Sequence, residues 1–101
     1  MAEEPCGPVA PIATFRALPE AIQRANATPF ALAACAFTGS HAKAEALSAG
    51  LHAGMVGINT LLIAHAEAPF GGMDHSGMGR EGGSQAIQDY LNVKTTHFAW
   101  G

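Results

Sequence analysis

The chain of 101 residues is poor in charge, because Asp, Glu, Lys and Arg make up only 13% of it, against about 25% in a typical soluble domain. Its five lysines and arginines are scattered singly, which excludes the clustered basic surface of a nucleic-acid-binding or anionic-membrane-binding protein. Its longest strongly apolar stretch, residues 55–64, is too short to span a bilayer. The acidic N-terminus has no hydrophobic signal region, so we expect a cytoplasmic protein. So few charges favour a surface that contacts other protein.

Cysteine is also scarce. Cys6 and Cys35 form neither a Cys-x-x-Cys pair nor a metal-ligand spacing, which predicts free thiols in a reducing compartment. Cys35 lies in an apolar run and is predicted to be a small core residue. Cys6 lies in a turn and has no His or Lys beside it in the sequence to activate its thiol, so we do not expect it to be catalytic. None of the five histidines has another histidine at i, i+4 or a thiolate nearby in the sequence, and no metal site is predicted.

The apolar pattern predicts an α/β fold with the order βαβαβ, followed by a short helix and a last strand. Pro19 suits a first helical turn, Asn26 a left-handed helix end, and Ser40 the N-cap of a second helix. A continuous apolar run is typical of a strand covered on both faces. Alternating elements of this kind predict parallel strands. The expected strands are residues 9–15, 30–38, 55–59 and 93–100, and the expected helices are residues 18–25, 40–51 and 84–91.

Residues 69–83 contain six glycines in fifteen positions. Glycine allows positive φ and close approach of two backbones, so such a loop marks a functional site or an interface. The stretch from Gly77 to Gly82 matches G-x-G-x-x-G literally. A dinucleotide-binding fingerprint needs a strand that leads directly into the first glycine and an acidic residue about twenty positions later. Neither is present, so we expect a structural loop here and not a phosphate-binding loop.

The N-terminal segment combines two carboxylates, Glu3 and Glu4, with a stiff turn at residues 5–8 that leads into the first expected strand. Such a turn would hold a carboxylate where it can accept hydrogen bonds from the hydroxyls of a ligand. By itself the pattern favours the simpler interpretation, a solvated acidic N-terminus.

In order and spacing, several motifs together resemble the C-terminal part of the NAD(P)-dependent aldehyde dehydrogenase superfamily, and most of all its succinate-semialdehyde dehydrogenase branch. These motifs are residues 3–9, 25–26, 30–38, 54–59, 68–72, 76–82 and 90–94. The resemblance implies that residues 1–91 are part of the catalytic domain and that residues 92–101 form an oligomerisation strand.

The resemblance also implies roles near the cofactor and the substrate. Glu4 would bind the hydroxyls of the nicotinamide ribose, and Cys6 stands where the family usually has a phenylalanine beside the nicotinamide. Phe70 would line the aldehyde pocket. Ala64 stands where the semialdehyde branch offers a serine to the carboxylate of its substrate, which disfavours succinate semialdehyde.

Structural roles follow from the same resemblance. Arg80, Gly71 and Gly72 would shape the glycine-rich loop near a subunit interface. The family's nucleophilic cysteine, its general-base glutamate and its dinucleotide-binding domain all lie upstream of the matched segment. Oxidation of an aldehyde to a carboxylate needs all three, so the chain alone should neither bind NAD or NADP nor turn over.

The expected partners are therefore the missing upstream portion of the enzyme and other copies of the chain. A non-catalytic, self-associating α/β module is the alternative, and an enzyme built on Cys6 is a more distant one.

Overall fold

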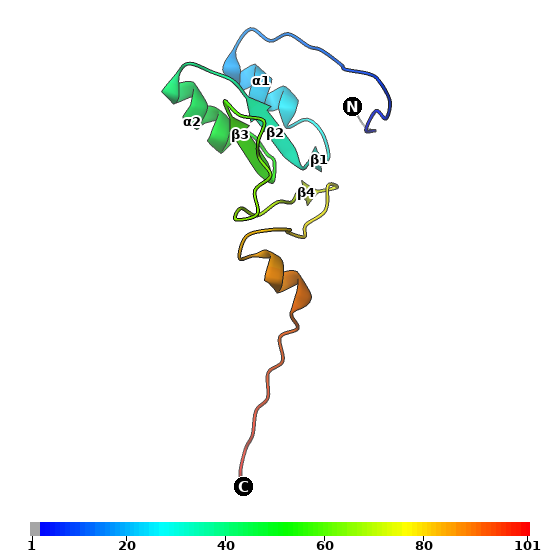
Figure 1. The fold of residues 1–101 in the computed structure, drawn as a ribbon, viewed down its shortest axis with the longest axis vertical. Helices are drawn as coiled ribbons and strands as arrows, with labels where there is room; N and C mark the ends of the chain where they lie inside the picture. The colour runs from blue at the N-terminus through cyan, green and yellow to red at the C-terminus, as the bar shows by residue number, and fades with distance from the viewer. Residues whose placement is uncertain (1–2) are drawn as a thin grey trace.

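The computed structural model describes residues 3–101 and contains a small α/β body with a long C-terminal extension (Figure 1). Helices and strands alternate through the body, which confirms the predicted α/β class. In chain order the elements are α1 (Leu18–Ala25), β1 (Phe30–Ala31), β2 (Ala33–Ala36), α2 (His41–Gly50), β3 (Met55–Ile58), β4 (Met73–Asp74) and the 3₁₀-helix η1 (Ala86–Tyr90).

Two short sheets organise the body. Strands β2 and β3 are parallel, with Ala33 opposite Met55 and Ala36 opposite Ile58. Strands β1 and β4 are antiparallel. Helices α1 and α2 both lie on one face of the β2–β3 sheet (Figure 1). The parallel pairing predicted for the second and third strands is therefore confirmed.

Both helices begin as their sequences predict. Pro19 lies in the first turn of α1, where a missing N–H costs nothing. The Ser40 side chain accepts a hydrogen bond of 3.4 Å from the amide of Lys43 and caps α2. The prediction for Asn26 is wrong, because its φ is −82° and not left-handed. Its side chain instead links the ends of the two helices: Nδ2 donates to the carbonyl of Gly50 at 2.8 Å, and Oδ1 accepts from the amide of His52 at 2.9 Å.

Asn59 ends the parallel sheet in a similar way. Its φ is +58°, a conformation that asparagine tolerates better than most residues. The side chain accepts a hydrogen bond from the amide of Thr38 at 2.7 Å and donates one to the carbonyl of Thr38 at 3.0 Å. These two bonds add one side-chain rung beyond the last backbone pair of β2 and β3.

Two strand predictions are corrected by the structure. Residues 9–15 form no strand, since a strand needs a neighbour for its backbone and Ile12 is 91% exposed. The predicted strand 30–38 is interrupted at Leu32, and its two parts, β1 and β2, pair with different strands. Only one face of β2 is covered by helices, so Cys35 on the other face is exposed and is not a core residue.

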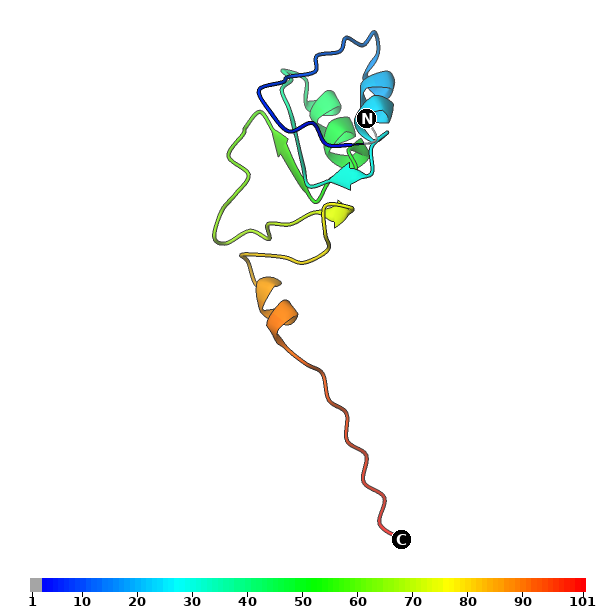
Figure 2. The same ribbon diagram turned by 90° about the vertical axis from the view of Figure 1, so that its right-hand side faces the viewer.

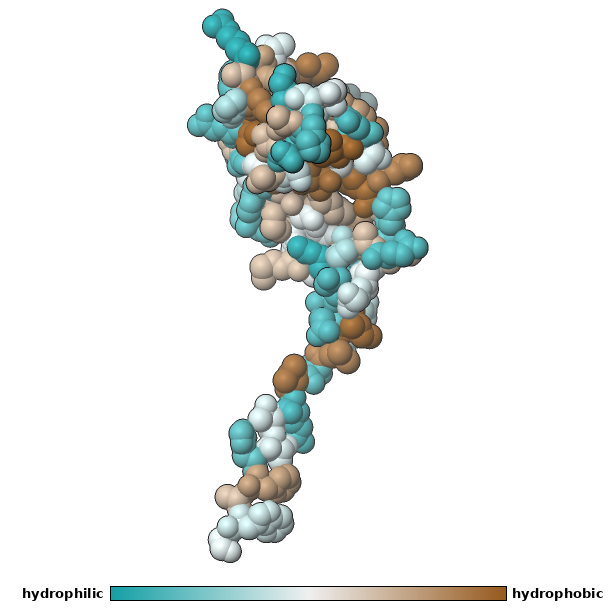
Figure 3. All heavy atoms as spheres, turned by 90° about the vertical axis from the view of Figure 1, so that its left-hand side faces the viewer, coloured by the Kyte–Doolittle hydropathy of each residue, from teal (hydrophilic) through white to brown (hydrophobic). Residues whose placement is uncertain are grey.

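The core of the described chain is small. Ala31, Leu47 and Met55 are the only buried hydrophobic residues among residues 3–101. The accessible surface is 8125 Å², whereas a compact monomer of 10.3 kDa would expose about 5,400 Å². Apolar side chains are spread over the surface of the body and along the extension (Figure 3). A surface of this kind is typical of a segment that packs against further polypeptide.

The C-terminal extension leaves the body after the glycine-rich loop. The predicted helix 84–91 is the shorter 3₁₀-helix η1, and residues 91–101 run on as an extended tail (Figure 2). Within residues 3–101 this tail pairs with no strand. The rings of Phe98 and Trp100 stack with their centroids 6.4 Å apart. The oligomerisation strand, and with it the domain boundary at residue 92, stays a prediction.

Candidate functional site

The glycine-rich loop folds back onto the body through β4, a strand that the sequence pattern did not predict. The Ser76 hydroxyl accepts a hydrogen bond from the amide of Ala31 at 3.0 Å, and the amide of His75 donates to the carbonyl of Pro29 at 3.1 Å. The Nε2 of His52 lies 2.7 Å from the Oδ2 of Asp74. These contacts hold the start of the loop against β1 and the end of α2.

A second set of backbone contacts closes the loop on itself. Phe70 and Glu81 form an isolated antiparallel bridge, in which each amide donates to the other's carbonyl at 2.7 Å. The amide of Gly83 donates to the carbonyl of Ala66 at 2.9 Å. Gly82 has a φ of +64°, and a Cβ there would lie 2.8 Å from the carbonyl oxygen of Ala68. Residues 66–70 and 81–83 are thus held side by side as two walls of one site.

Arg80 lies next to the second wall and binds the middle of the loop. Its Nη1 donates hydrogen bonds to three carbonyls, at 2.7 Å to Gly72, 2.9 Å to Gly79 and 3.2 Å to Met78. Its backbone amide donates to the Oδ2 of Asp89 at 2.8 Å. The guanidinium therefore satisfies carbonyls that the irregular loop leaves without ladder partners.

Gly71 and Gly72 are both buried beneath Arg80. A Cβ on Gly71 would lie 2.3 Å from the carbonyl oxygen of Gly79, and a Cβ on Gly72 would lie 2.6 Å from the Cβ of Ser76. Glycine is needed at these positions because two stretches of the loop touch there, as the loop's composition predicts.

The backbone amides of residues 77–82 test whether the literal G-x-G-x-x-G match could bind a phosphate. The amide of Gly77 donates to Asp74, that of Arg80 to Asp89, and that of Glu81 to Phe70. A phosphate-binding loop needs such amides free to point at the ligand. No full helix follows either, since η1 is a five-residue 3₁₀-helix. Three amides of the loop are thus already engaged, which favours a structural loop over a phosphate-binding one.

The two walls border a wide-open hollow of about 390 Å³. It brings together Ala64 and Phe70, the two residues assigned to the substrate pocket from sequence. The hollow is lined by Ala64, His65, Ala66, Phe70, Glu81 and Gly82. His65 and Glu81 are additions that the sequence did not single out. Glu81 reaches the hollow because its backbone pairs with Phe70, eleven residues earlier, and no local pattern reveals that pairing.

Glu4 and Cys6 lie apart from this hollow, in the exposed N-terminal segment. The Sγ of Cys6 is 3.9 Å from the backbone carbonyl oxygen of Glu4. Within residues 3–101 the Glu4 carboxylate has no hydrogen-bond or salt-bridge partner. The roles of Glu4 and Cys6 near the cofactor stay predictions. The described residues hold no group of three or more His, Cys, Asp or Glu side chains able to bind a metal ion.

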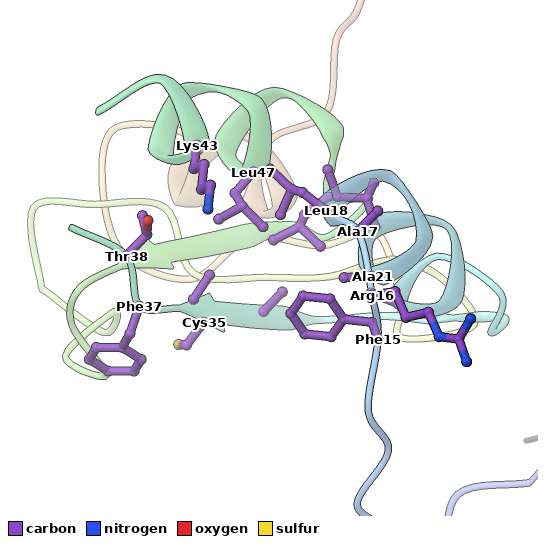
Figure 4. Close-up of a pocket in the computed structure, with 15 residues that line it drawn as sticks. Phe15, Arg16, Ala17, Leu18, Ala21, Cys35, Phe37, Thr38, Lys43 and Leu47 are labelled. Atoms are coloured by element: carbon purple, nitrogen blue, oxygen red, sulfur yellow. The ribbon is translucent and has the colours of Figure 1, made fainter. Parts of the chain in front are cut away.

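A larger hollow of about 740 Å³ lies between α1, α2 and β2. Leu18 and Leu47 project into it from the helices, and Phe15 lies beside it (Figure 4). Cys35 on β2 and Phe37, just after β2, point to the opposite face of the sheet (Figure 4). The side chains that line the hollow are apolar apart from Arg16, Thr38 and Lys43 at its edges. It lacks a nucleophile–base pair and has the character of an incompletely filled core.

Comparison with known proteins defines the class of protein to which this fold and site belong. The model of the aldehyde dehydrogenase family matches residues 1–96. The chain belongs to the aldehyde dehydrogenase family.

The similar proteins include members of the branch that the motifs resemble. The succinate semialdehyde dehydrogenase of Acinetobacter baylyi is 49% identical over 96 residues, which are 95% of this chain and 20% of that protein. The crystal structure of succinate-semialdehyde dehydrogenase from Burkholderia pseudomallei has a TM-score of 0.78 and 44% identity over 83% of this chain and 17% of that one. An indole-3-acetaldehyde dehydrogenase solved with NAD⁺ has a TM-score of 0.87 and 41% identity over 94% of this chain and 19% of that one.

The chain spans about a fifth of the length of the curated relatives that it matches. Among residues 3–101 no helix is long and apolar enough to cross a membrane.

Proposed function

We propose that the chain acts as one part of a complete NAD(P)-dependent aldehyde dehydrogenase, in which it supplies a wall of the aldehyde pocket and one contact to the cofactor. The observation that carries this proposal is the family match over residues 1–96, combined with coverage of only about a fifth of each relative. In that assembly Phe70 and Ala64 line the pocket, while Arg80, Gly71 and Gly72 hold the loop that shapes it. Glu4 accepts hydrogen bonds from the nicotinamide ribose.

The chemistry of the reaction comes from outside this chain. Oxidation of an aldehyde needs a thiolate to attack the carbonyl, a nicotinamide to take the hydride and a base to activate water. Cys6 and Cys35 are both exposed, and within residues 3–101 neither thiol contacts a basic side chain. The chain by itself is therefore expected to be inactive.

The unpartnered apolar surface supports an intimate fit with the rest of such an enzyme. Phe15 beside the open hollow is 58% exposed, and Phe37 and Leu32, which flank β2 in the sequence, are 66% and 42% exposed. Val93 and Trp100 on the extended tail are 97% and 92% exposed. Covering the first group would complete the core of the sheet, and covering the second would join subunits through the tail.

Family membership indicates the class of reaction but does not indicate which aldehyde is the substrate. Relatives of similar identity carry the names succinate semialdehyde, betaine aldehyde and retinaldehyde dehydrogenase. Their printed substrates include an anion, a cation and an apolar molecule. Family membership therefore supports an aldehyde as substrate, and the lining of the pocket has to decide which one.

The test replaces the matching segment of the Acinetobacter baylyi relative with this chain. We call the resulting full-length protein the exchanged enzyme. Aldehyde-dependent reduction of NAD⁺ or NADP⁺ is expected from the exchanged enzyme and not from the 101-residue chain. Turnover by the chain alone would contradict the proposal. A folded exchanged enzyme that binds the nicotinamide cofactor but oxidises no aldehyde would also contradict it.

Glu4 is tested in the same exchanged enzyme. Replacing Glu4→Gln removes the charge but keeps the size of the side chain, and it is expected to raise the KM for the cofactor about tenfold, since a hydrogen bond to a charged group contributes about 1.5 kcal/mol or more. Glu3→Gln is the matched control and should leave that KM unchanged. Equal effects of the two substitutions would show that only general charge matters.

A further inference from the structure

We propose that His52 and Asp74 are positioning residues, which fix the glycine-rich loop to the end of α2 and thereby set the place of Phe70. The step from the loop to the aldehyde pocket rests on the proposed function. The inference starts from one contact between distant parts of the chain. The Nε2 of His52 lies 2.7 Å from the Oδ2 of Asp74, 22 residues further along.

The contact is a short hydrogen bond with a defined direction. A carboxylate can only accept hydrogen bonds, so the Nε2 of His52 donates its proton to Asp74. The distance is at the short end of the range for N–H···O hydrogen bonds, as is typical of a charged acceptor. Both side chains are about half exposed, so water competes for them. We therefore expect the contact to act locally and to add little to the total stability.

The backbone of Asp74 indicates that its side chain is needed. Its φ is +53°, a conformation that glycine adopts without strain and that most other residues avoid. Aspartate tolerates it better than most residues, but glycine would fit as well in a loop that already uses glycine often. The aspartate is explained if its carboxylate makes a contact that glycine cannot make.

His52 is itself fixed on its own side of the contact. Its backbone amide donates to the Oδ1 of Asn26, just after α1, at 2.9 Å. The Nδ2 of Asn26 donates to the carbonyl of Gly50, the last residue of α2, at 2.8 Å. The imidazole therefore extends from a backbone that is already tied to the ends of both helices. Its hydrogen bond to Asp74 connects those helix ends to the loop.

The loop side of the contact has few other attachments. Strand β4, which begins the turn, pairs with β1 over two residues only (Figure 1). Two further hydrogen bonds follow, from the amide of His75 to the carbonyl of Pro29 and from the amide of Ala31 to the hydroxyl of Ser76. Among the described residues, the contact to His52 is the only side-chain hydrogen bond between residues 71–83 and residues 41–54. So short a pairing resists local opening only weakly.

The position of β4 reaches Phe70 through a short and tightly packed link. Phe70 precedes Asp74 by four residues, and Gly71 and Gly72 between them are buried. A Cβ on Gly54 would collide with the carbonyl oxygen of Gly71, so the link lies directly against the segment before β3. A link packed in this way cannot absorb a displacement of β4, and we expect such a displacement to move Phe70.

A second pair of a histidine and a carboxylate provides the matched control. The Nε2 of His41 lies 3.2 Å from the Oε1 of Glu45, four residues later on α2, and both side chains are mostly exposed. The chemical groups are the same as in the first pair, but the contact joins neighbouring turns of one helix. Removing it should therefore leave the loop unchanged.

The first test measures amide hydrogen exchange in the full 101-residue chain by NMR. His52→Ala removes the donor, and Asp74→Gly removes the acceptor while it keeps the positive φ. Each is expected to lower the protection of the amides of His75 and Gly77 about threefold, the size of effect that one partly exposed pair can have. The amide of Asn59, which donates to β2 at the far end of the parallel sheet, should keep its protection.

Further variants separate a specific contact from general damage. The double variant His52→Ala with Asp74→Gly should lose no more protection than either single variant, because both remove the same contact. His52→Gln keeps an amide donor in nearly the same place and should restore most of the protection. His41→Ala should lose none. Additive losses in the double variant, no rescue by glutamine, or an equal loss at the Asn59 amide would each overturn the proposal.

The second test follows the pocket in the exchanged enzyme. It uses whichever of succinate semialdehyde, betaine aldehyde and retinaldehyde that enzyme oxidises fastest. His52→Ala is expected to raise the KM for the aldehyde about threefold and to leave the KM for the nicotinamide cofactor unchanged, with rescue by His52→Gln. An unchanged KM for the aldehyde, or an equal rise in both constants, would overturn the link to the pocket and leave the proposed function standing.

The two tests also fail separately. An exchanged enzyme that folds but oxidises none of the three aldehydes would contradict the proposed function. The hydrogen-exchange measurement would still decide whether His52 and Asp74 hold the loop. If the chain alone proves too loosely folded for that measurement, the same amides are followed in the exchanged enzyme by mass spectrometry, with the same expected loss and the same control.

Discussion

The packed part of the chain, residues 18–83, and its extension, residues 84–101, use apolar residues in opposite ways. All three buried hydrophobic residues, Ala31, Leu47 and Met55, belong to the packed part. In the extension Ile87, Tyr90, Leu91, Val93, Phe98 and Trp100 are all more than half exposed. The packed part has neighbours within the chain for its strands and its glycine-rich loop. The extension contacts that loop through Asp89, and its last residues, 91–101, pair with no strand among residues 3–101.

This difference separates two kinds of contribution. Backbone approach and side-chain hydrogen bonds stabilise the walls of the pocket from inside the chain. The extension is stabilised by the hydrophobic effect only when its apolar side chains are buried against another surface. Substitutions in the two parts should therefore change different measurements.

The largest effect is expected at Gly71. A Cβ there would lie 2.3 Å from the carbonyl oxygen of Gly79, and two backbones cannot separate as easily as a flexible side chain can move. Gly71→Ala should lower the free energy of unfolding of the chain by about 3 kcal/mol or more. Denaturant unfolding followed by circular dichroism measures it. Gly39→Ala, where the new methyl group meets nothing within 4 Å, is the control, and equal losses at both positions would refute the close approach.

Leu47 should come next, because it is the buried side chain that joins α2 to the sheet. Leu47→Ala is expected to lower the free energy of unfolding by about 2–4 kcal/mol through lost burial and a cavity. The same measurement on Leu62→Ala, whose side chain is 77% exposed, should show a change of less than about 1 kcal/mol. A small loss at Leu47 would mean that the body has no packed core of its own.

A smaller effect is expected at Asn59. Asn59→Gly keeps the positive φ but removes both hydrogen bonds to Thr38, and should cost about 1 kcal/mol. Asn59→Ala should cost about 1 kcal/mol more, because alanine resists the left-handed conformation. If glycine proved harmless and alanine did not, φ alone would explain the choice of asparagine.

The smallest change in stability is expected at Trp100, which is 92% exposed at the end of the tail. Trp100→Ala should alter the free energy of unfolding by less than about 0.5 kcal/mol. It should nevertheless weaken self-association, as measured by sedimentation velocity over a range of concentrations. A loss of stability without a change in association would place the tail in the packed part after all.

The local elements could be predicted from sequence where a short-range cause exists. Pro19 marks the start of α1 through its fixed backbone, and Ser40 marks the start of α2 through its side-chain cap. The glycines of the loop indicate close contact between backbones. The strand at residues 9–15 was predicted wrongly, because alternation does not supply the neighbouring strand that its backbone needs. Cys35 was placed in the core for a related reason: apolar neighbours in sequence do not show whether both faces of a sheet are covered.

The sequence alone determined the family, the order of the helices and the principal parallel strands, and the presence of a glycine loop kept for its backbone. These depend on residue identity and on spacing along the chain. Only the tertiary structure decided that Phe70 pairs with Glu81, that Glu81 and His65 join Ala64 and Phe70 at one hollow, and that Arg80 acts through three loop carbonyls. These contacts join residues that are separated along the chain, and folding alone brings them within hydrogen-bond distance of one another.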